Sequence, residues 1–284
     1  MLLLVPSSVL RPGRPDEHFA AEAAAARELG IGVGLVDHDA LTSPGGADTA
    51  VRRVQEEGTA VYRGWMLRRA EYRAFDEALR RRGVTLATGH DQYRRAHELP
   101  GWYAELADLT PRSSWTVGCA RADFTDACRA LGPGPAVLRD YTKSLKHHWN
   151  EAAFIPELND EDAAWSIAAR FRELRGPDIT GGYVIRRFET FTSPEVRTWW
   201  IHGTCHLTGP HPDTPDDLPA TPVDVSAAAP YIARLGLPFV TADFVQRADG
   251  QWRIVELGDG QVSDRPGAVA AERLIDSLRR HIDG

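Results

Sequence analysis

The sequence has few cysteines, no excess of basic residues and no long apolar run. Its three cysteines, Cys119, Cys128 and Cys205, lack C-x-x-C spacing, so neither a disulfide framework nor a zinc site is indicated. Reduced thiols of this kind are typical of a cytoplasmic protein, and that is the localisation we expect. The net charge of −7 provides no basic surface for nucleic acid, and no stretch approaches the ~18 apolar residues of a membrane span. We therefore expect neither nucleic acid nor membrane as a partner.

The beginning of the chain also lacks the features of a signal peptide. Met1–Pro6 is too short for the apolar region of such a peptide, and no basic region precedes it. This apolar segment instead predicts a buried first strand. No G-x-G-x-x-G sequence follows a predicted strand, so a dinucleotide-binding fold is not expected.

The first third of the sequence alternates predicted strands with predicted helices. This order favours a parallel sheet with helices packed against it. Asp37 stands at the end of one strand, where open α/β sheets bind their ligands. The strands are predicted at Leu2–Val5, Val33–Asp37, Ala60–Arg63 and Val84–Ala87, and the helices at Asp16–Leu29 and Arg69–Arg82.

The character of the sequence changes after about residue 100. Gly101–Tyr103 and Pro111–Trp115 are aromatic stretches that we predict as loops, and the glycines and prolines of Gly132–Pro135 indicate a turn. We place a domain boundary near Val117, which gives domains at 1–117 and 118–284. The second domain reads as mixed α+β with mostly antiparallel strands. Its loop Thr208–Pro222 is either a lid or an ordinary surface loop.

A predicted hairpin near the C-terminus carries three carboxylates. Asp243 lies near the end of the strand Pro238–Val245, Glu256 ends the strand Arg253–Glu256, and Asp259 lies on the loop that follows. Clustered carboxylates repel one another unless a cation lies between them, and hard oxygen ligands suit Mg²⁺. The alternative is a solvated hairpin edge.

Two groups of charged residues precede this hairpin. Arg139, Lys143 and Lys146 begin on a strand and continue into a polar loop, an arrangement suited to several phosphate oxygens. Glu195 and Arg197 are two residues apart on a predicted strand, so their side chains share one face. This pair is either a structural salt bridge or a clamp for a phosphate or carboxylate.

In this order, the motifs resemble the ATP-grasp superfamily, and within it the clade named for one arginine and two lysines. The likeness runs from about Val117 to the C-terminus, and the first third resembles the domain that precedes ATP-grasp modules. The resemblance implies an α/β (α+β) ATP-grasp fold with an N-terminal parallel α/β pre-ATP-grasp domain. It rests on Arg139, Lys143, Lys146, Gly182–Glu189, Pro194–Arg197, Asp243 and Val255–Gln261.

The resemblance also implies roles for individual residues, with ATP and Mg²⁺ as cofactors. The backbone near Phe188 would meet the adenine, and Glu189 would bind the ribose or the purine edge. One departure from the family pattern is Gly258, which stands where the superfamily often has asparagine, so the number of metal ions and the part of Asp259 stay open. The implied phosphate ligands are Arg139, Lys143, Lys146 and Arg197, with Arg197 and Lys146 as catalytic residues, and the implied metal ligands are Asp243, Glu256 and Asp259.

The implied activity is that of an ADP-forming ligase that joins a carboxylate to an amine through an acyl phosphate. Phosphorylation supplies the leaving group that a carboxylate lacks, and the protein contributes positioning and charge neutralisation. The expected partners are small-molecule carboxylates and amines, such as amino acids or a peptide, and a homodimer is plausible. Two alternatives remain: a nucleotide-binding assembly or regulatory factor acting on a protein partner, and a small-molecule kinase.

Overall fold

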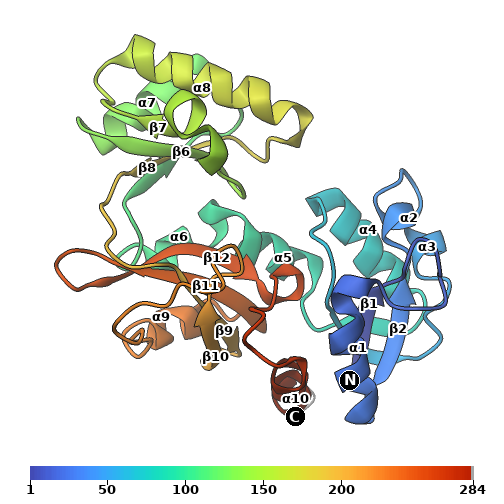
Figure 1. Cartoon of the computed structure of the whole chain (residues 1–284). Helices are drawn as coiled ribbons and strands as arrows, with labels where there is room; N and C mark the ends of the chain where they lie inside the picture. Colours follow the sequence, from blue (N-terminus) through green and yellow to red (C-terminus); the bar gives the residue numbers. More distant parts are fainter. Residues whose placement is uncertain (283–284) are drawn as a thin grey trace. The chain divides into compact units, whose positions relative to one another are not determined.

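The computed structural model describes residues 1–282, and its contacts divide the chain into two compact units. Unit 1 contains residues 1–96, residues 193–244 and the described chain from residue 256 onward. Unit 2 contains residues 97–192 and 245–255. Figure 1 shows the course of the chain through these segments. Each unit therefore combines segments that are distant in the sequence.

The N-terminal part of unit 1 contains the predicted parallel sheet. Its strand order is β2-β1-β3-β4, and every pairing is parallel. The crossovers require helices because parallel neighbours cannot be joined by a tight turn. The strands are β1 (Leu2–Pro6), β2 (Gly32–Val36), β3 (Gly58–Tyr62) and β4 (Val84–Leu86), close to the predicted ranges.

The helices of this part cover the sheet. The side chain of Asp16 accepts a hydrogen bond from the His18 amide ahead of α1, and Gly30 follows α1 with a φ of 72°, in agreement with the predicted ends. Alternate residues of β1 enter different hydrophobic clusters, so apolar side chains cover both faces of the sheet. The helices are α1 (Ala20–Glu28), α2 (His38–Leu41), α3 (Ala47–Ala50), α4 (Arg69–Arg80) and α5 (His90–His97).

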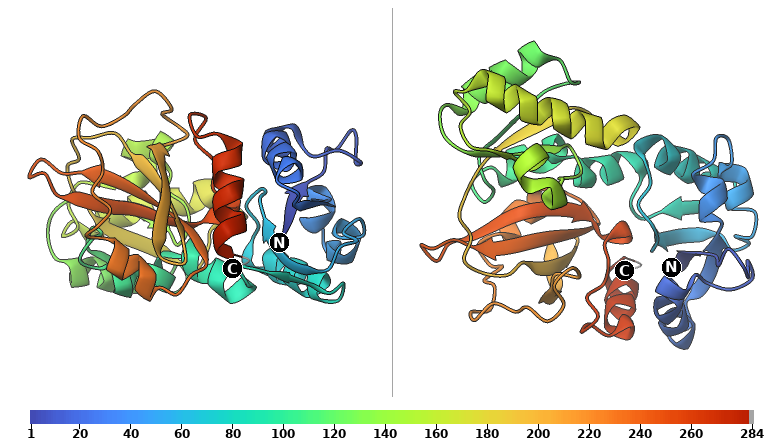
Figure 2. Two further views of the ribbon diagram at one scale, coloured as in Figure 1. Left: turned by 90° about the horizontal axis from the view of Figure 1, so that it is seen from below. Right: turned by 45° about the horizontal axis from the view of Figure 1, so that its top comes forward.

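A second sheet has the strand order β10-β9-β11-β12, with β9 paired antiparallel to both β10 and β11. The chain passes from unit 1 to unit 2 along β11 and returns along β12. Helix α10 lies beside α1, as both views in Figure 2 show. The elements are β9 (Val196–Ile201), β10 (Thr204–Pro210), α9 (Ala229–Arg234), β11 (Phe239–Gln246), β12 (Trp252–Asp259) and α10 (Ala271–Ile282).

Two sequence predictions in this sheet were wrong. The predicted loop Thr208–Pro222 begins too early, because its first residues belong to β10. His202 and Gly203 have φ values of 46° and 79°, which is the left-handed turn that joins neighbouring antiparallel strands. In addition, β12 continues beyond Glu256, so Asp259 is the last residue of a strand and does not lie on the predicted loop.

Unit 2 is an antiparallel sheet in the order β5-β8-β6-β7 with helices α7 and α8 packed on it. Two aromatic stretches predicted as loops were wrong: Gly101–Tyr103 lies inside α6, and Ser113–Trp115 forms β5. In α6, burial of Leu99, Trp102 and Leu106 outweighs the low helix propensity of Gly101. The elements are α6 (Leu99–Leu106), β5 (Ser113–Trp115), α7 (Arg121–Leu131), β6 (Ala136–Asp140), β7 (Phe154–Ile155), α8 (Glu161–Arg175) and β8 (Tyr183–Arg187).

The predicted α/β (α+β) fold class is thus confirmed. The division into domains at 1–117 and 118–284 stays a prediction. The two compact units are defined by contacts within the chain, and the chain passes from one unit to the other at residues 96/97, 192/193, 244/245 and 255/256. The last two residues of the predicted second domain, 283 and 284, lie outside the described residues. None of the helices in residues 1–282 combines the length and the apolarity that crossing a membrane demands.

A buried arginine links the distant segments of unit 1. Arg63, directly after β3, is 1% exposed and donates from Nε and Nη2 to the carboxylate of Glu22 on α1 at 2.7 and 3.0 Å. Its Nη1 donates to the backbone oxygens of Gly260, Gln261 and Ser263, just after β12. One guanidinium therefore fixes the segment after β12 against the parallel sheet.

Removing the carboxylate partner tests this link. We expect Glu22→Ala to lower the free energy of unfolding by about 3–5 kcal/mol, because it leaves a buried guanidinium without its counter-charge. Urea denaturation measures the change. The control is Glu28→Ala on the exposed face of the same helix, and equal stability of the two variants would contradict a structural role for the ion pair.

Candidate functional site

A buried carboxylate shapes the loop that carries the predicted phosphate-binding lysines. Asp140, the last residue of β6, is 0% exposed, and its Oδ1 accepts from the backbone N–H groups of Thr142 and Lys143 at 2.8 and 2.7 Å. Its Oδ2 accepts from the guanidinium of Arg175 and from the amide of Thr180. The turn after β6 therefore has a fixed backbone.

The three predicted cations lie on the end of β6 and the segment that follows it, in unit 2. Arg139 is 7% exposed, and its Nη2 donates to the backbone oxygen of Thr142 at 2.8 Å, so the side chain folds over the turn. Lys143 and Lys146 are exposed, and Lys146 begins a short 3₁₀ turn. The structure thus brings the three residues into one segment, with the arginine buried and the lysines facing solvent.

The predicted adenine-facing residue Phe188 follows β8. Its amide donates to the backbone oxygen of Pro135 at 3.1 Å, and its ring is 37% exposed. The ring centroid lies 5.3 Å from that of Phe154 and 6.3 Å from that of Trp149. Phe188 is therefore part of a partly exposed aromatic group in unit 2, a surface on which a planar base can pack.

Glu189 has two arginine partners that the sequence analysis did not foresee. Arg253 contacts its two carboxylate oxygens through Nε and Nη2, each at 3.0 Å, and Arg247 lies 3.8 Å away. Glu189 also lines a cavity of about 420 Å³ with residues 190 and 247–249. A ribose hydroxyl bound here would share a carboxylate that Arg253 already orients.

In unit 1, strand pairing brings Arg197 and Asp243 together. The two residues lie opposite each other on β9 and β11, and the guanidinium donates from Nε and Nη2 to the two carboxylate oxygens at 2.9 and 2.8 Å. Burial acts to lower the pKa of Arg197, but hydrogen bonding to Asp243 and the charges of Asp243, Glu256 and Asp264 outweigh it and raise the pKa. The sequence left two roles open for Glu195 and Arg197, a salt bridge with each other or a clamp for a phosphate or carboxylate. The structure pairs Arg197 with Asp243, and the clamp role stays a prediction.

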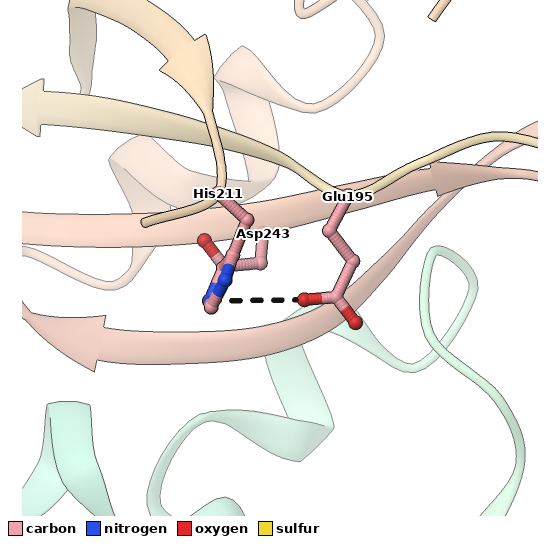
Figure 3. A group of neighbouring side chains, drawn as sticks. All are labelled: Glu195, His211 and Asp243. Carbon is pink, nitrogen blue, oxygen red and sulfur yellow. Dashed lines mark ion pairs between the residues drawn. The ribbon is translucent and has the colours of Figure 1, made fainter. Parts of the chain in front are cut away.

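His211 lies beside Asp243 and Glu195, as Figure 3 shows. It follows β10, and its Nε2 lies 2.8 Å from Nη2 of Arg197, 3.5 Å from the carboxylate of Asp243 and 3.8 Å from that of Glu195. Among residues 1–282, the side chains of Glu195, His211 and Asp243 form the group whose potential ligand atoms all lie within 4.8 Å of one another. A cation bound there would compete with the guanidinium of Arg197 for Asp243.

Asp259 has surroundings different from those of Asp243. It is 0% exposed, its Oδ1 accepts from the backbone and side-chain N–H groups of Gln261 at 2.9 and 3.1 Å, and its Oδ2 has no hydrogen-bond partner among the described residues. Burial raises the pKa of Asp259 to about 7. These contacts favour a structural, partly protonated carboxyl, and the predicted metal role of Asp259 stays untested.

Sequence reasoning missed Asp140 and His211. Asp140 was detectable, since an aspartate at a strand end with a threonine two residues on is a common signal for a side-chain-capped turn. His211 had no such signal. Its position depends on β10, which the sequence analysis had assigned in part to a loop.

The mixed α/β fold, with one parallel sheet and antiparallel sheets, matches solved ATP-grasp structures. More specifically, the chain belongs to an ATP-grasp domain family, the third family of the clade named for one arginine and two lysines, whose model matches residues 130–278. No protein with curated annotation matches the sequence.

Solved structures of similar fold cover nearly the whole chain. D-cycloserine synthetase is 16% identical, with 99% of this chain and 100% of that chain covered and a TM-score of 0.65. A RimK domain ATP-grasp protein from Sphaerobacter thermophilus is 18% identical, with 96% and 98% covered and a TM-score of 0.63. N5-carboxyaminoimidazole synthase from Aspergillus clavatus is 11% identical, with 99% and 77% covered and a TM-score of 0.63. At these identities the likeness shows the fold.

A pH series tests the surroundings of Asp259. A carboxyl whose pKa is higher in the folded than in the unfolded chain contributes stability that is lost as pH rises through that interval. Relative to Asp259→Asn, we expect the free energy of unfolding of the unaltered protein to fall by on the order of 1 kcal/mol per pH unit from about pH 4 to 7, and then to level off. Urea denaturation at a series of pH values measures the free energy of unfolding of both proteins, and Asp123→Asn is the charge-matched exposed control. A flat difference would contradict a buried, protonated Asp259.

Proposed function

We propose that this chain is an ATP- and Mg²⁺-dependent ligase that joins a carboxylate to an amine through an acyl phosphate and releases ADP and phosphate. The observation that carries the proposal is the arginine–lysine turn of unit 2 in a chain of the ATP-grasp family. Similar folds named as a synthetase and a synthase, and an ATP-grasp ligase solved with a precursor peptide, support it. The substrates we propose are small carboxylic acids or peptides and amines.

The residues available fit the charges of ATP. We propose that Arg139, Lys143 and Lys146 contact the phosphates, with Lys146 and Arg197 at the transferred phosphoryl group. Guanidinium groups bind phosphate oxygens as a fork, and ammonium groups act as point charges. Asp140 supports this role, because its bonds to the backbone of residues 142 and 143 hold the turn without using the lysine side chains.

For the metal we propose Asp243 and Glu256 as ligands. Both are carboxylates, the ligand type that Mg²⁺ prefers. A bound Mg²⁺ would neutralise phosphate charge during transfer. Asp259 is left out of the proposed ligands because burial favours its protonated form. Arg197 holds the carboxylate of Asp243 in a fixed orientation.

The chemistry asked of the protein is mainly binding and orientation. A carboxylate reacts poorly with an amine because its oxygen is a bad leaving group, and transfer of phosphate to that oxygen removes the obstacle. The amine then attacks the carbonyl carbon, the C–O bond to phosphate breaks and phosphate leaves, while the amine loses a proton. The cationic side chains stabilise the charge of the phosphate throughout.

The direct test is incubation with ATP, Mg²⁺ and a panel of carboxylic acids and amines. Release of ADP and phosphate together with an amide product, identified by mass spectrometry, is the expected result. A phosphorylated acceptor without amide would instead identify a kinase. Absence of ATP binding by calorimetry would overturn both.

Glu256→Gln tests the proposed metal ligand. We expect turnover to fall by about 100-fold or more with the fold retained, because a neutral amide no longer offsets the charge of Mg²⁺. Steady-state release of ADP measures turnover, and circular dichroism checks the fold. Glu272→Gln, an exposed site on α10, is the matched control. A fully active Glu256→Gln enzyme would refute the assignment.

Asp140→Ala tests the support of the lysine turn. Loss of its hydrogen bonds to residues 142 and 143 should weaken ATP binding by about tenfold, because a misplaced lysine loses a charge-assisted contact. Calorimetric titration with ATP and Mg²⁺ measures the affinity, and Asp123→Ala, which removes an exposed carboxylate of the same unit, is the control. Unchanged affinity in a folded Asp140→Ala variant would separate the turn from phosphate binding.

A further inference from the structure

A cavity in unit 1 lies at the carboxyl edge of the parallel sheet. Its volume is about 310 Å³, near the lower end of the range for small-molecule sites. It is lined by segments that follow three strands: Ser7 and Ser8 after β1, Asp37 to Asp39 after β2, and Trp65 after β3. None of these residues is among the proposed nucleotide or metal ligands.

Strand pairing explains why these segments converge. β2, β1 and β3 are neighbours, with Pro6 opposite Val36 and Leu4 opposite Tyr62, and all three strands run in the same direction. The amide of Ser7 continues the ladder by donating to the backbone oxygen of Val36 at 2.8 Å. Open α/β sheets bind ligands at this edge. Asp37 therefore lies at this edge of the sheet, as its predicted position at the end of a strand indicated.

The charge of the lining is negative. Asp16, Asp37 and Asp39 contribute carboxylates, and no lysine or arginine among residues 1–282 lines the cavity. Among these lining residues the potential cation is His38, and burial lowers the pKa of this imidazole against the opposing effect of nearby carboxylates, so it is neutral at neutral pH. An anionic ligand would be repelled, whereas a cationic ligand would be attracted.

An aromatic side chain in the lining also suits an organic ligand. Trp65 is 36% exposed, and its ring is backed by Phe19 and His18, with centroids at 4.9 and 4.6 Å. A supported indole face attracts ammonium and guanidinium groups.

The spacing of the carboxylates does not favour a metal ion. In the described chain, the three-residue group with ligand atoms within 4.8 Å of one another is that of Glu195, His211 and Asp243, and it includes none of the cavity carboxylates. A metal ion requires ligands that converge on one point. Separated carboxylates beside an aromatic face match a cation extended over several atoms.

We propose that this cavity binds a small organic cation, a molecule that carries a primary ammonium or guanidinium group on a short apolar chain. The ammonium or guanidinium group interacts with Asp37 and Asp39, and the chain packs on Trp65. Binding at this cavity does not require ATP, so the proposal stands or falls separately from the ligase activity.

Calorimetric titration of the full chain without ATP tests the proposal, with cadaverine and agmatine as cationic probes, glutarate as the anionic probe and Mg²⁺ as the metal probe. We expect both amines to bind at millimolar or lower concentration and glutarate not to bind. Asp37→Asn and Asp39→Asn should each weaken amine binding by about tenfold. Asparagine keeps the acceptor that Asp37 offers to the Ala40 amide at 3.0 Å, so α2 stays capped.

Trp65 supplies a second measurement that locates the bound probe. Cadaverine should change the tryptophan fluorescence of the unaltered protein, and Trp65→Phe should remove that change. Asp123→Asn, far along the sequence in unit 2, is the charge-matched control and should bind like the unaltered protein. The proposal is overturned if the amines do not bind, if glutarate binds equally, if Mg²⁺ competes with the amines, or if neither aspartate variant weakens binding.

Discussion

The contacts of Arg63 are the constraint on which unit 1 depends. One guanidinium holds Glu22 on α1 and three backbone oxygens after β12, which lie 197 to 200 residues beyond Arg63 in the chain. Gln261 adds to the link, since its side chain accepts from the Tyr62 amide and donates to the hydroxyl of Tyr72. A buried hydrogen-bond network stabilises the fold fully only when every donor and acceptor in it has a partner. It therefore couples the strand that carries Glu256 to the parallel sheet of the same unit.

The same network explains the different surroundings of two carboxylates on one hairpin. Asp243 faces Arg197 and His211, whereas Asp259, three residues beyond Glu256, turns into the interior beside Gln261. Asp243 is held by a permanent cation, whereas burial favours protonation of Asp259 and outweighs the opposing charge of Arg63. Proximity in a sequence motif thus does not imply a common role, because strand direction and burial decide which side chains share an environment.

Much of the fold was predictable, because periodic apolar segments and strong stop signals mark β1, α1, α4 and the final hairpin. The errors have physical causes. α6 was missed because its helix depends on burial of Trp102 and not on local propensity, and β10 was missed because its polar residues pair with β9. At the candidate site, the residue types were readable from the sequence, but the partners Arg253 for Glu189 and Asp243 for Arg197 depend on long-range pairing.

The capped turn after β6 has a consequence for variation and for protein engineering. Asp140 holds this turn through the backbone amides of residues 142 and 143 and through the hydroxyl of Thr142, so these bonds do not depend on the side chain at position 143. Positions 143 and 146 are exposed and can change identity at little cost to folding, while position 140 tolerates little change. Charge on this loop can thus diverge between related chains, or be altered by design, on a backbone that stays constant.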